Sequence, residues 1–258
     1  MILALDVGNT NIKIALFNQG TMIHYWRVAT IINRTHDEYG ITLLMLMQAA
    51  GVAPEDVEGI IMSSVVPSVN FTMEHMCKDY FHRAPMLVAP GIKTGIRIRY
   101  ENPRDLGSDR IANAVAVHAE YGGPAIFIDF GTATSYGVLS AAGEFLGGAI
   151  GPGVQLSAQA LFEHTARLPK IELVKPATAI QNTTVTNMQA GIVFGYVGQV
   201  EYIVGRMRAE LGDEKTRVIA TGGLARLISS ESSCIDVLDG ELTLKGLLYI
   251  YQRNAPMA

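Results

Sequence analysis

The sequence predicts an α/β fold made of two similar halves, each a β-meander followed by helices. Apolar runs of strand length alternate with helical patterns, and the opening pattern of residues returns in the second half. The composition agrees with a large folded core, because 49% of the 258 residues are apolar and only 17% are charged, which excludes disorder. So low a charged fraction also indicates a chain that associates with itself.

The first half opens with three predicted strands joined by tight turns. An apolar run ends in the acid Asp6, and turn residues from Gly8 to Asn11 separate it from a second run that alternates like a strand. The three strands are expected at residues 2–6, 12–17 and 22–28. Helical periodicity and a Pro at a helix start then predict helices at 37–50, 67–80 and 108–120, with a short buried strand at 59–62.

The second half repeats the meander and ends in helices. Strands are expected at 125–129 and 136–139, followed by a glycine-rich stretch at 147–153 that leads into a helix. The remaining predicted elements are helices at 154–162, 186–211 and 243–251, a strand at 217–220 and a turn at 221–223.

The two meanders align when the chain is shifted by 123 residues, the distance from Asp6 to Asp129. The match then continues in one register, pairing Gly8 with Gly131, Asn9 with Thr132, Leu16 with Leu139 and Gly20 with Gly143. A strand, an acid, a glycine turn and a return strand are hard to repeat by chance. The repeat predicts two domains, residues 1–121 and 122–258, with the boundary near Tyr121-Gly122-Gly123-Pro124.

Each repeated hairpin combines an aspartate at a strand end with a glycine turn. The carboxylate can hold a hydrated metal ion or position a proton, and the backbone N–H groups of the turn can approach phosphate oxygens closely. A single hairpin of this kind is more often an ordinary turn with an exposed acid. The duplicated pair favours phosphate binding from both sides of a nucleotide.

Several motifs together resemble one protein family. They are Asp6-Val7-Gly8-Asn9-Thr10-Asn11 with Lys13, Gly107-Ser108-Asp109-Arg110, Ile128-Asp129-Phe130-Gly131-Thr132-Ala133, Gly148-Ala149-Ile150-Gly151-Pro152-Gly153 and Thr221-Gly222-Gly223. The hairpins resemble the superfamily of actin, hexokinase and the 70-kDa heat-shock ATPases, and the whole set resembles the type III pantothenate kinases. Ser108 stands where that family usually has Ala, a small change that we expect to be tolerated and to add an N-cap hydrogen bond.

The resemblance implies two ribonuclease-H-like halves with the active site in the cleft between them. It also implies transfer of the ATP γ-phosphoryl group to the primary hydroxyl of pantothenate, the first step of coenzyme A biosynthesis. The ATP-binding residues implied are Asp6, Val7, Gly8, Asn9, Thr10, Asn11, Ile12 and Lys13 of the first phosphate loop, together with Thr132.

The same resemblance implies the substrate and ion sites. Pantothenate would be bound by Tyr100, Gly107, Ser108, Asp109, Arg110 and, from the neighbouring subunit, Thr184, with Asp109 as the general base. Asp129 would hold a monovalent cation, K⁺ or NH₄⁺, and Asp6 would hold Mg²⁺, most simply through water.

Taken alone, three of these residues also allow structural interpretations. Asp109 could be an acid favoured by the helix dipole, Arg110 a surface ion pair, and Tyr100 a core aromatic residue on a strand. Two other functions stay open: a phosphatase or ATPase of the same superfamily, and a non-catalytic accessory factor for gene expression. The intact aspartates Asp6, Asp109 and Asp129 argue against the non-catalytic factor.

Charge and hydropathy limit the partners. The net charge is −4 and no Lys/Arg run occurs, so nucleic acid is not expected as a ligand, and no apolar stretch is long enough to cross a membrane. Cys77 and Cys234 stand apart, as free thiols in a reducing cytoplasm would.

The long helix predicted at 186–211 carries Gly191, Gly195 and Gly198 on one face. This spacing lets a second helix approach closely, either from within the chain or from another subunit. With the low charge and the family resemblance, it predicts a homodimer.

Overall fold

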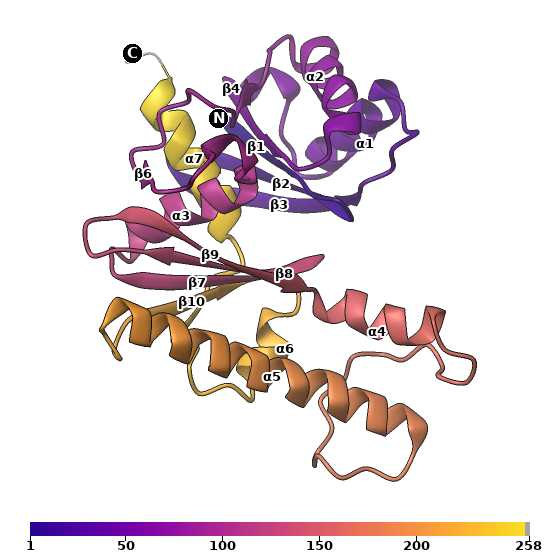
Figure 1. Ribbon diagram of the computed structural model, residues 1–258. Coiled ribbons are helices and arrows are strands. Elements are labelled where there is room, and N and C mark those ends of the chain that lie inside the picture. Colours follow the sequence, from indigo (N-terminus) through magenta and orange to yellow (C-terminus); the bar gives the residue numbers. More distant parts are fainter. Residues whose placement is uncertain (256–258) are drawn as a thin grey trace. The chain divides into compact units, whose positions relative to one another are not determined.

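The computed structural model describes residues 1–255 and divides the chain into two compact units (Figure 1). Of the described residues, the first unit comprises Met1–Ala119 and 242–255, and the second comprises Glu120–Glu241. Among the described residues, no helix combines the length and the apolar character needed to cross a membrane.

The first unit contains a five-stranded sheet in the order β3-β2-β1-β4-β5. Strand β1 pairs antiparallel with β2 and parallel with β4, so the predicted meander is confirmed and extended. The strands are β1 (Ile2–Val7), β2 (Asn11–Asn18), β3 (Thr21–Ala29), β4 (Gly59–Ser64) and β5 (Met86–Leu87). The other elements between residues 1 and 120 are α1 (His36–Ala49), η1 (Pro54–Asp56), α2 (Pro67–Phe81), β6 (Arg97–Ile98), η2 (Pro103–Asp105) and α3 (Ser108–Glu120).

Strand β1 is buried on both faces because helices cover both sides of this sheet. Leu3, Leu5 and Val7 pack in a core with residues of α1 and α2, whereas Ala4 belongs to a second core on the opposite side. Strands buried on both sides have near-continuous apolar sequences, which explains the apolar run that opens the chain.

The C-terminal helix α7 (Leu242–Asn254) belongs to the first unit, so the predicted 122–258 domain is wrong at its end. This helix packs against β1, β2 and β4, and Leu244 and Leu247 fill the same core as Ala4. Gly246 lets α7 cross α3 closely, since an added Cβ would collide with the backbone of Ala112. An amphipathic pattern predicts this helix but does not indicate which sheet it covers.

The second unit contains its own meander. Within this unit the strand order is β11-β10-β7-β8-β9, with β10 parallel to β7 and with β7, β8 and β9 antiparallel. The strands are β7 (Ala125–Phe130), β8 (Ala133–Leu139), β9 (Glu144–Pro152), β10 (Arg217–Thr221) and β11 (Val237–Leu238). The helices are α4 (Val154–Glu163), α5 (Thr184–Leu211) and α6 (Ala225–Ser229).

The glycine-rich stretch is a strand rather than a connection, because β9 runs through it to Pro152. Gly148 gives room to the neighbouring strand β8, because a Cβ at this position would collide with the backbone of Tyr136; in β8, a Cβ at Gly137 would collide with the ring of Phe127. Small residues here therefore reflect close strand packing.

The two hairpins are similar but differ by one residue. In the first, Val7 lies opposite Ile12, whereas in the second Phe130 lies opposite Thr134, so the second loop is shorter. The counterpart of Leu16 is consequently Val138 and not Leu139 as the simple shift predicts, because Leu16 faces Leu3 while Val138 faces Ile126.

Candidate functional site

Asp6 lies at the end of β1, and each of its two carboxylate oxygens contacts a polar side chain. Oδ1 accepts a hydrogen bond from the Ser63 hydroxyl at 2.8 Å, and Oδ2 lies 3.4 Å from Lys13 Nζ. The sheet register causes both contacts, since Asp6 is opposite Lys13 in β2 and Ser63 in β4. Asp6 is only 6% exposed, so a charged pair is fixed at this edge of the sheet.

The loop after Asp6 is closed by backbone hydrogen bonds. The Gly8 N–H donates to the Asn11 carbonyl at 3.1 Å, and Thr30 bonds to Gly8 O through its hydroxyl at 2.6 Å and to Thr10 O through its N–H at 3.0 Å. Asn9 and Thr10 are exposed and Asn11 is half-buried. Thr30 was not predicted, because it is distant in sequence and follows β3.

Two members of the predicted phosphate loop point into the core. Val7 and Ile12 are fully buried, in the same apolar cluster as Leu5. Their side chains cannot contact a ligand, so any contribution they make to phosphate binding comes from the backbone.

Ser108 ties the start of α3 to the sheet edge that carries Asp6. Its hydroxyl accepts a hydrogen bond from the Ser64 N–H at 3.0 Å and donates one to the Ser64 carbonyl at 3.1 Å. Ser64 is next to Ser63 and opposite Val7 in the parallel register. The prediction that Ser108 caps its own helix is therefore wrong, because its hydroxyl forms hydrogen bonds with the backbone of β4 instead.

Asp109 lies in the first turn of α3, as predicted, and is half-buried. Its Oδ1 accepts a hydrogen bond from the Arg110 N–H at 2.8 Å. A Cβ at Gly107 would lie 2.5 Å from the same oxygen, so the glycine leaves room for the carboxylate. Arg110 is only 7% exposed, which rules out the interpretation that it forms an ordinary surface ion pair.

Asn113 is a candidate that the sequence analysis missed. It lies one helical turn after Asp109, is 1% exposed, and has no hydrogen-bond partner for its amide oxygen or nitrogen among the described residues. Helical side chains lean toward the preceding turn, which here contains Asp109. The i, i+4 spacing from Asp109 is the signal that could have identified it.

Asp129 and the second glycine turn lie at the carboxyl ends of β7 and β10. Thr221 pairs with Asp129, and a Cβ at the next residue, Gly222, would lie 2.6 Å from the buried Asp129 Oδ1. A Cβ at Gly153 would collide with the carbonyl oxygen of Thr132. The glycine motifs at 148–153 and 221–223 therefore keep space around this hairpin.

Tyr100 belongs to the first unit and Thr184 to the second. Tyr100 is half-buried in an irregular segment after β6. Thr184 is exposed at the first residue of α5, where Thr183 caps the helix by accepting from the Thr186 N–H at 3.2 Å. Tyr196, which bonds to Pro152 O at the end of β9 at 2.8 Å, is twelve residues further along α5, or about 18 Å.

Metal-binding side chains do not cluster in the described part of the chain, where no three His, Cys, Asp or Glu residues could hold an ion. An ion at Asp6 or Asp129 would therefore need water, backbone carbonyl or ligand oxygens as its other partners. Both cysteines are free, as predicted, and burial raises the pKa of the Cys77 thiol to about 12.

Two sheet units, each with a strand-end aspartate and a glycine turn, form a mixed α/β fold like that of hexokinase-type structures. The sequence model of the type III pantothenate kinases matches residues 2–206, and the chain belongs to this family of ATP-dependent kinases.

Solved structures support the same fold. A protein from Campylobacter jejuni described as a Baf family transcriptional activator has a TM-score of 0.61 and 17% identity, and 98% of each chain is covered. A protein from Sinorhizobium meliloti described as a 2-dehydro-3-deoxygalactonokinase also has a TM-score of 0.61, with 11% identity over 100% of this chain and 98% of that one. A hexokinase of the ROK type from Thermus thermophilus has a TM-score of 0.50, with 14% identity over 98% and 99%.

Proposed function

We propose that the protein transfers the γ-phosphoryl group of ATP to the primary hydroxyl of pantothenate, in the cytoplasm and as the first step toward coenzyme A. The observation that carries this proposal is the Ser108–Ser64 connection, which attaches the 107–110 motif to the strand edge that carries Asp6. A phosphate hairpin and a substrate-side carboxylate on one edge suit a kinase better than a hydrolase.

Phosphoryl transfer depends mainly on positioning and charge neutralisation. Lys13, held beside Asp6, offers a positive charge to the phosphates, and the backbone N–H groups of the 8–11 loop offer hydrogen bonds. Asp109 accepts the proton of the pantothenate hydroxyl. The hydroxyl oxygen forms a bond to the γ-phosphorus while the bond between that phosphorus and ADP breaks. Arg110 forms an ion pair with the carboxylate of pantothenate, and Tyr100 and Gly107 form the rest of the pantothenate site.

Mg²⁺, when bound, neutralises charge on the triphosphate. Asp6 is the residue that would hold it, and the donor set fits a water-mediated contact, because both carboxylate oxygens already have a protein partner.

The test is an assay of ATP consumption with pantothenate, without it, and with a hexose in its place. The proposal expects ADP formation that depends on pantothenate, with phosphopantothenate detected by mass spectrometry. Equal ATP consumption without an acceptor would indicate an ATPase or phosphatase, and no consumption under any condition would favour an accessory factor.

The accessory-factor alternative has one observation in its favour, the similarity to the Campylobacter jejuni protein. At 17% identity this similarity concerns the fold alone. The chain keeps Asp6, Asp109 and Asp129, and Asp6 is held by Ser63 and Lys13, so we favour the kinase.

Activity is expected to require a monovalent cation, with Asp129 as its ligand. Gly222 leaves room for the carboxylate, which lies beside the Gly131-Thr132 turn, where its negative charge would repel a phosphate. A weakly hydrated ion such as K⁺ or NH₄⁺ can be held by this carboxylate and backbone carbonyls. The measurement is a titration with KCl against NaCl at equal ionic strength, and equal rates in the two salts would return Asp129 to a structural role.

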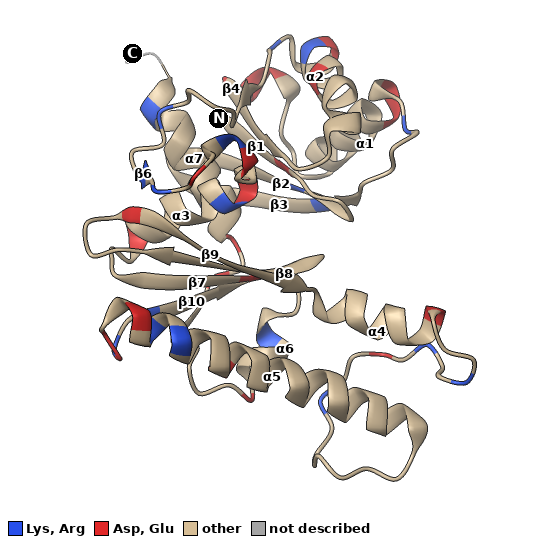
Figure 2. Cartoon of the chain, viewed as in Figure 1, with Lys and Arg blue, Asp and Glu red and all other residues tan. Residues whose placement is uncertain are grey.

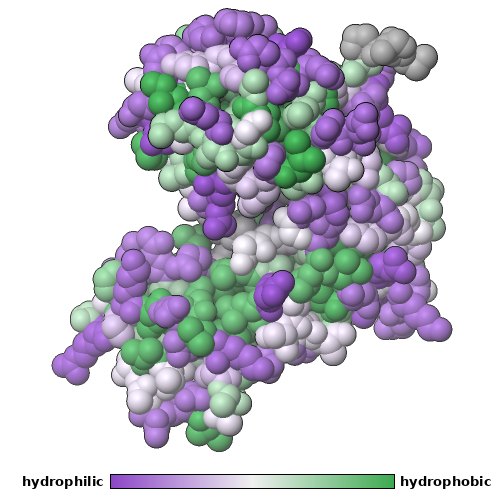
Figure 3. Space-filling model, turned by 180° about the vertical axis from the view of Figure 1, so that it is seen from behind, coloured by the Kyte–Doolittle hydropathy of each residue, from purple (hydrophilic) through white to green (hydrophobic). Residues whose placement is uncertain are grey.

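We also propose that two copies associate through α5. Gly191, Gly195 and Gly198 are exposed, and a Cβ at any of them would meet nothing within 4 Å, so no element among residues 1–255 packs there. No charged residue occurs from Thr184 to Val200, and Figure 2 shows charges on α5 only near its C-terminal end. Exposed apolar side chains also occur in β9 and α4: Leu146, Ile150, Leu156 and Phe162. Figure 3 shows apolar patches on the surface of the second unit.

Gly195→Leu is expected to convert the dimer into a monomer, because the new side chain would occupy the space of the approaching helix. If Thr184 contributes to the pantothenate site of the neighbouring subunit, activity falls with dissociation. Light scattering with a parallel kinase assay measures both. Ala209→Leu, at the charged end of α5, is the matched control, and a Gly195→Leu protein that stays dimeric would contradict the proposed interface.

A further inference from the structure

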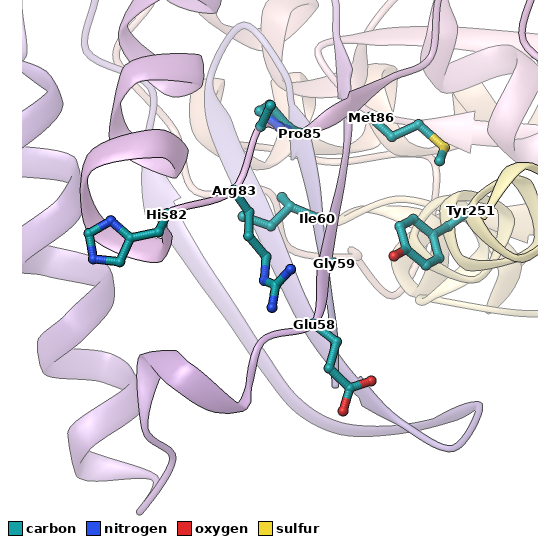
Figure 4. Close-up of a pocket in the computed structure, with 9 residues that line it drawn as sticks. Glu58, Gly59, Ile60, His82, Arg83, Pro85, Met86 and Tyr251 are labelled. Atoms are coloured by element: carbon teal, nitrogen blue, oxygen red, sulfur yellow. The ribbon is translucent and has the colours of Figure 1, made fainter. Parts of the chain in front are cut away.

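A cavity of about 370 Å³ opens in the first unit at the amino-terminal ends of β4 and β5. It is bordered by Gly59 and Ile60 of β4, by Arg83 and Pro85 before β5, and by Tyr251 of α7 (Figure 4). The pairing between β4 and β5 begins only at Ile61 and Met86, so on that side no described strand lies beside Gly59 and Ile60.

Gly59 makes room for the Tyr251 hydroxyl at the border of the cavity. An added Cβ at this position would collide with the Tyr251 hydroxyl, which in Figure 4 points toward the Gly59 backbone. A side chain at 59 would thus displace the tyrosine and fill the space that it borders.

Two polar groups in this cavity are without a partner among the described residues. Arg83 Nε donates to the Val57 carbonyl at 2.7 Å, which orients the guanidinium group while its two terminal nitrogens make no bond to the described chain. The Tyr251 hydroxyl likewise has no partner there. Figure 4 shows Arg83 and Tyr251 on either side of Gly59, whereas the His82 ring points away.

We propose that this cavity binds a small oxyanion, the phosphate or carboxylate group of a metabolite. A guanidinium group presents parallel N–H donors that match two oxygens of such a group, and a tyrosine hydroxyl adds a third donor. The one acid at the rim, Glu58, lies 3.2 Å from the Met1 amino group, so its charge is compensated.

This site is separate from the proposed kinase site. Ser63, which holds Asp6, lies four residues further along β4 than Gly59, or about 13 Å at the rise of a strand. The two sites are at opposite ends of that strand, and the oxyanion site does not depend on which substrate the kinase uses.

The experiment follows the Arg83 Nε–Hε resonance of the full chain labelled with ¹⁵N-arginine, assigned by its loss in Arg83→Gln. Sodium phosphate and sodium acetate are titrated in separate arms, each against NaCl at equal ionic strength. The proposal expects a saturable shift with at least one oxyanion and none with chloride, and comparison of the two arms distinguishes phosphate from carboxylate recognition.

Tyr251→Phe should weaken that binding about tenfold, because it removes one hydrogen bond to a charged group while keeping the ring. The exposed Arg206 side chain, which lies 3.9 Å from Glu210, is the internal control for unspecific ion effects. Absence of a saturable shift with both oxyanions, or a shift of the same size at Arg206, would overturn the proposal. The kinase activity of Arg83→Gln should equal that of the wild type. A failure of the oxyanion-site proposal can therefore be distinguished from a failure of the kinase proposal.

Discussion

Asp109→Asn is expected to slow pantothenate phosphorylation by about 10²–10⁴-fold while leaving pantothenate binding largely intact. The substitution keeps the shape of the side chain and removes its ability to accept a proton. The half-buried carboxylate is held by the Arg110 N–H and has space because residue 107 is glycine. Steady-state kinetics with calorimetry of pantothenate binding separate the loss of catalysis from a loss of affinity.

Asp105→Asn is the matched control for this substitution. Asp105 is an exposed acid in η2, four residues before Asp109, and should give wild-type rates. Wild-type turnover in Asp109→Asn would instead mean that Asp109 serves only the N-terminus of its helix.

Asp6→Ala is expected to weaken Mg²⁺–ATP binding by about 10- to 100-fold, because the first hairpin loses its carboxylate and the partner of Lys13. Calorimetry with Mg²⁺–ATP measures this effect. Affinity for pantothenate in the absence of nucleotide should change little.

A second variant separates a loss of Mg²⁺–ATP binding from a loss of folding stability. The alanine leaves the fully buried Ser63 hydroxyl without its acceptor, whereas Asp6→Asn retains an oxygen for it. If both variants fold, as judged by thermal unfolding, and bind Mg²⁺–ATP like the wild type, Asp6 has only a structural role.

Most elements could be predicted from the sequence because their patterns are local. The strand-length apolar runs that became β1, β2 and β7 end within two residues of their predicted ends. Helix α5 begins two residues earlier than predicted, because the Thr183 side chain caps it. Such caps depend on one hydrogen bond, so periodicity alone places a helix end only approximately.

The candidate site was predictable only in part, for a similar reason. The motif at 107–110 can be read from the sequence, but its attachment to β4 through Ser108 and Ser64 joins residues 44 positions apart. Thr30, which closes the first loop, and Asn113, with its buried amide, gave no motif of their own. The burial of Val7 and Ile12 depends on α1 and α2, which pack in the same apolar core.

By itself the sequence determined the α/β class, the duplicated meander and the aspartate–glycine hairpins, since strand periodicity and turn chemistry act over a few neighbouring residues. Only the tertiary structure decided that α7 covers the first sheet, that Gly148 of β9 serves strand packing, and that Arg83 and Tyr251 border one cavity. These outcomes depend on which apolar faces meet and on contacts between distant residues, and a linear pattern does not record such contacts.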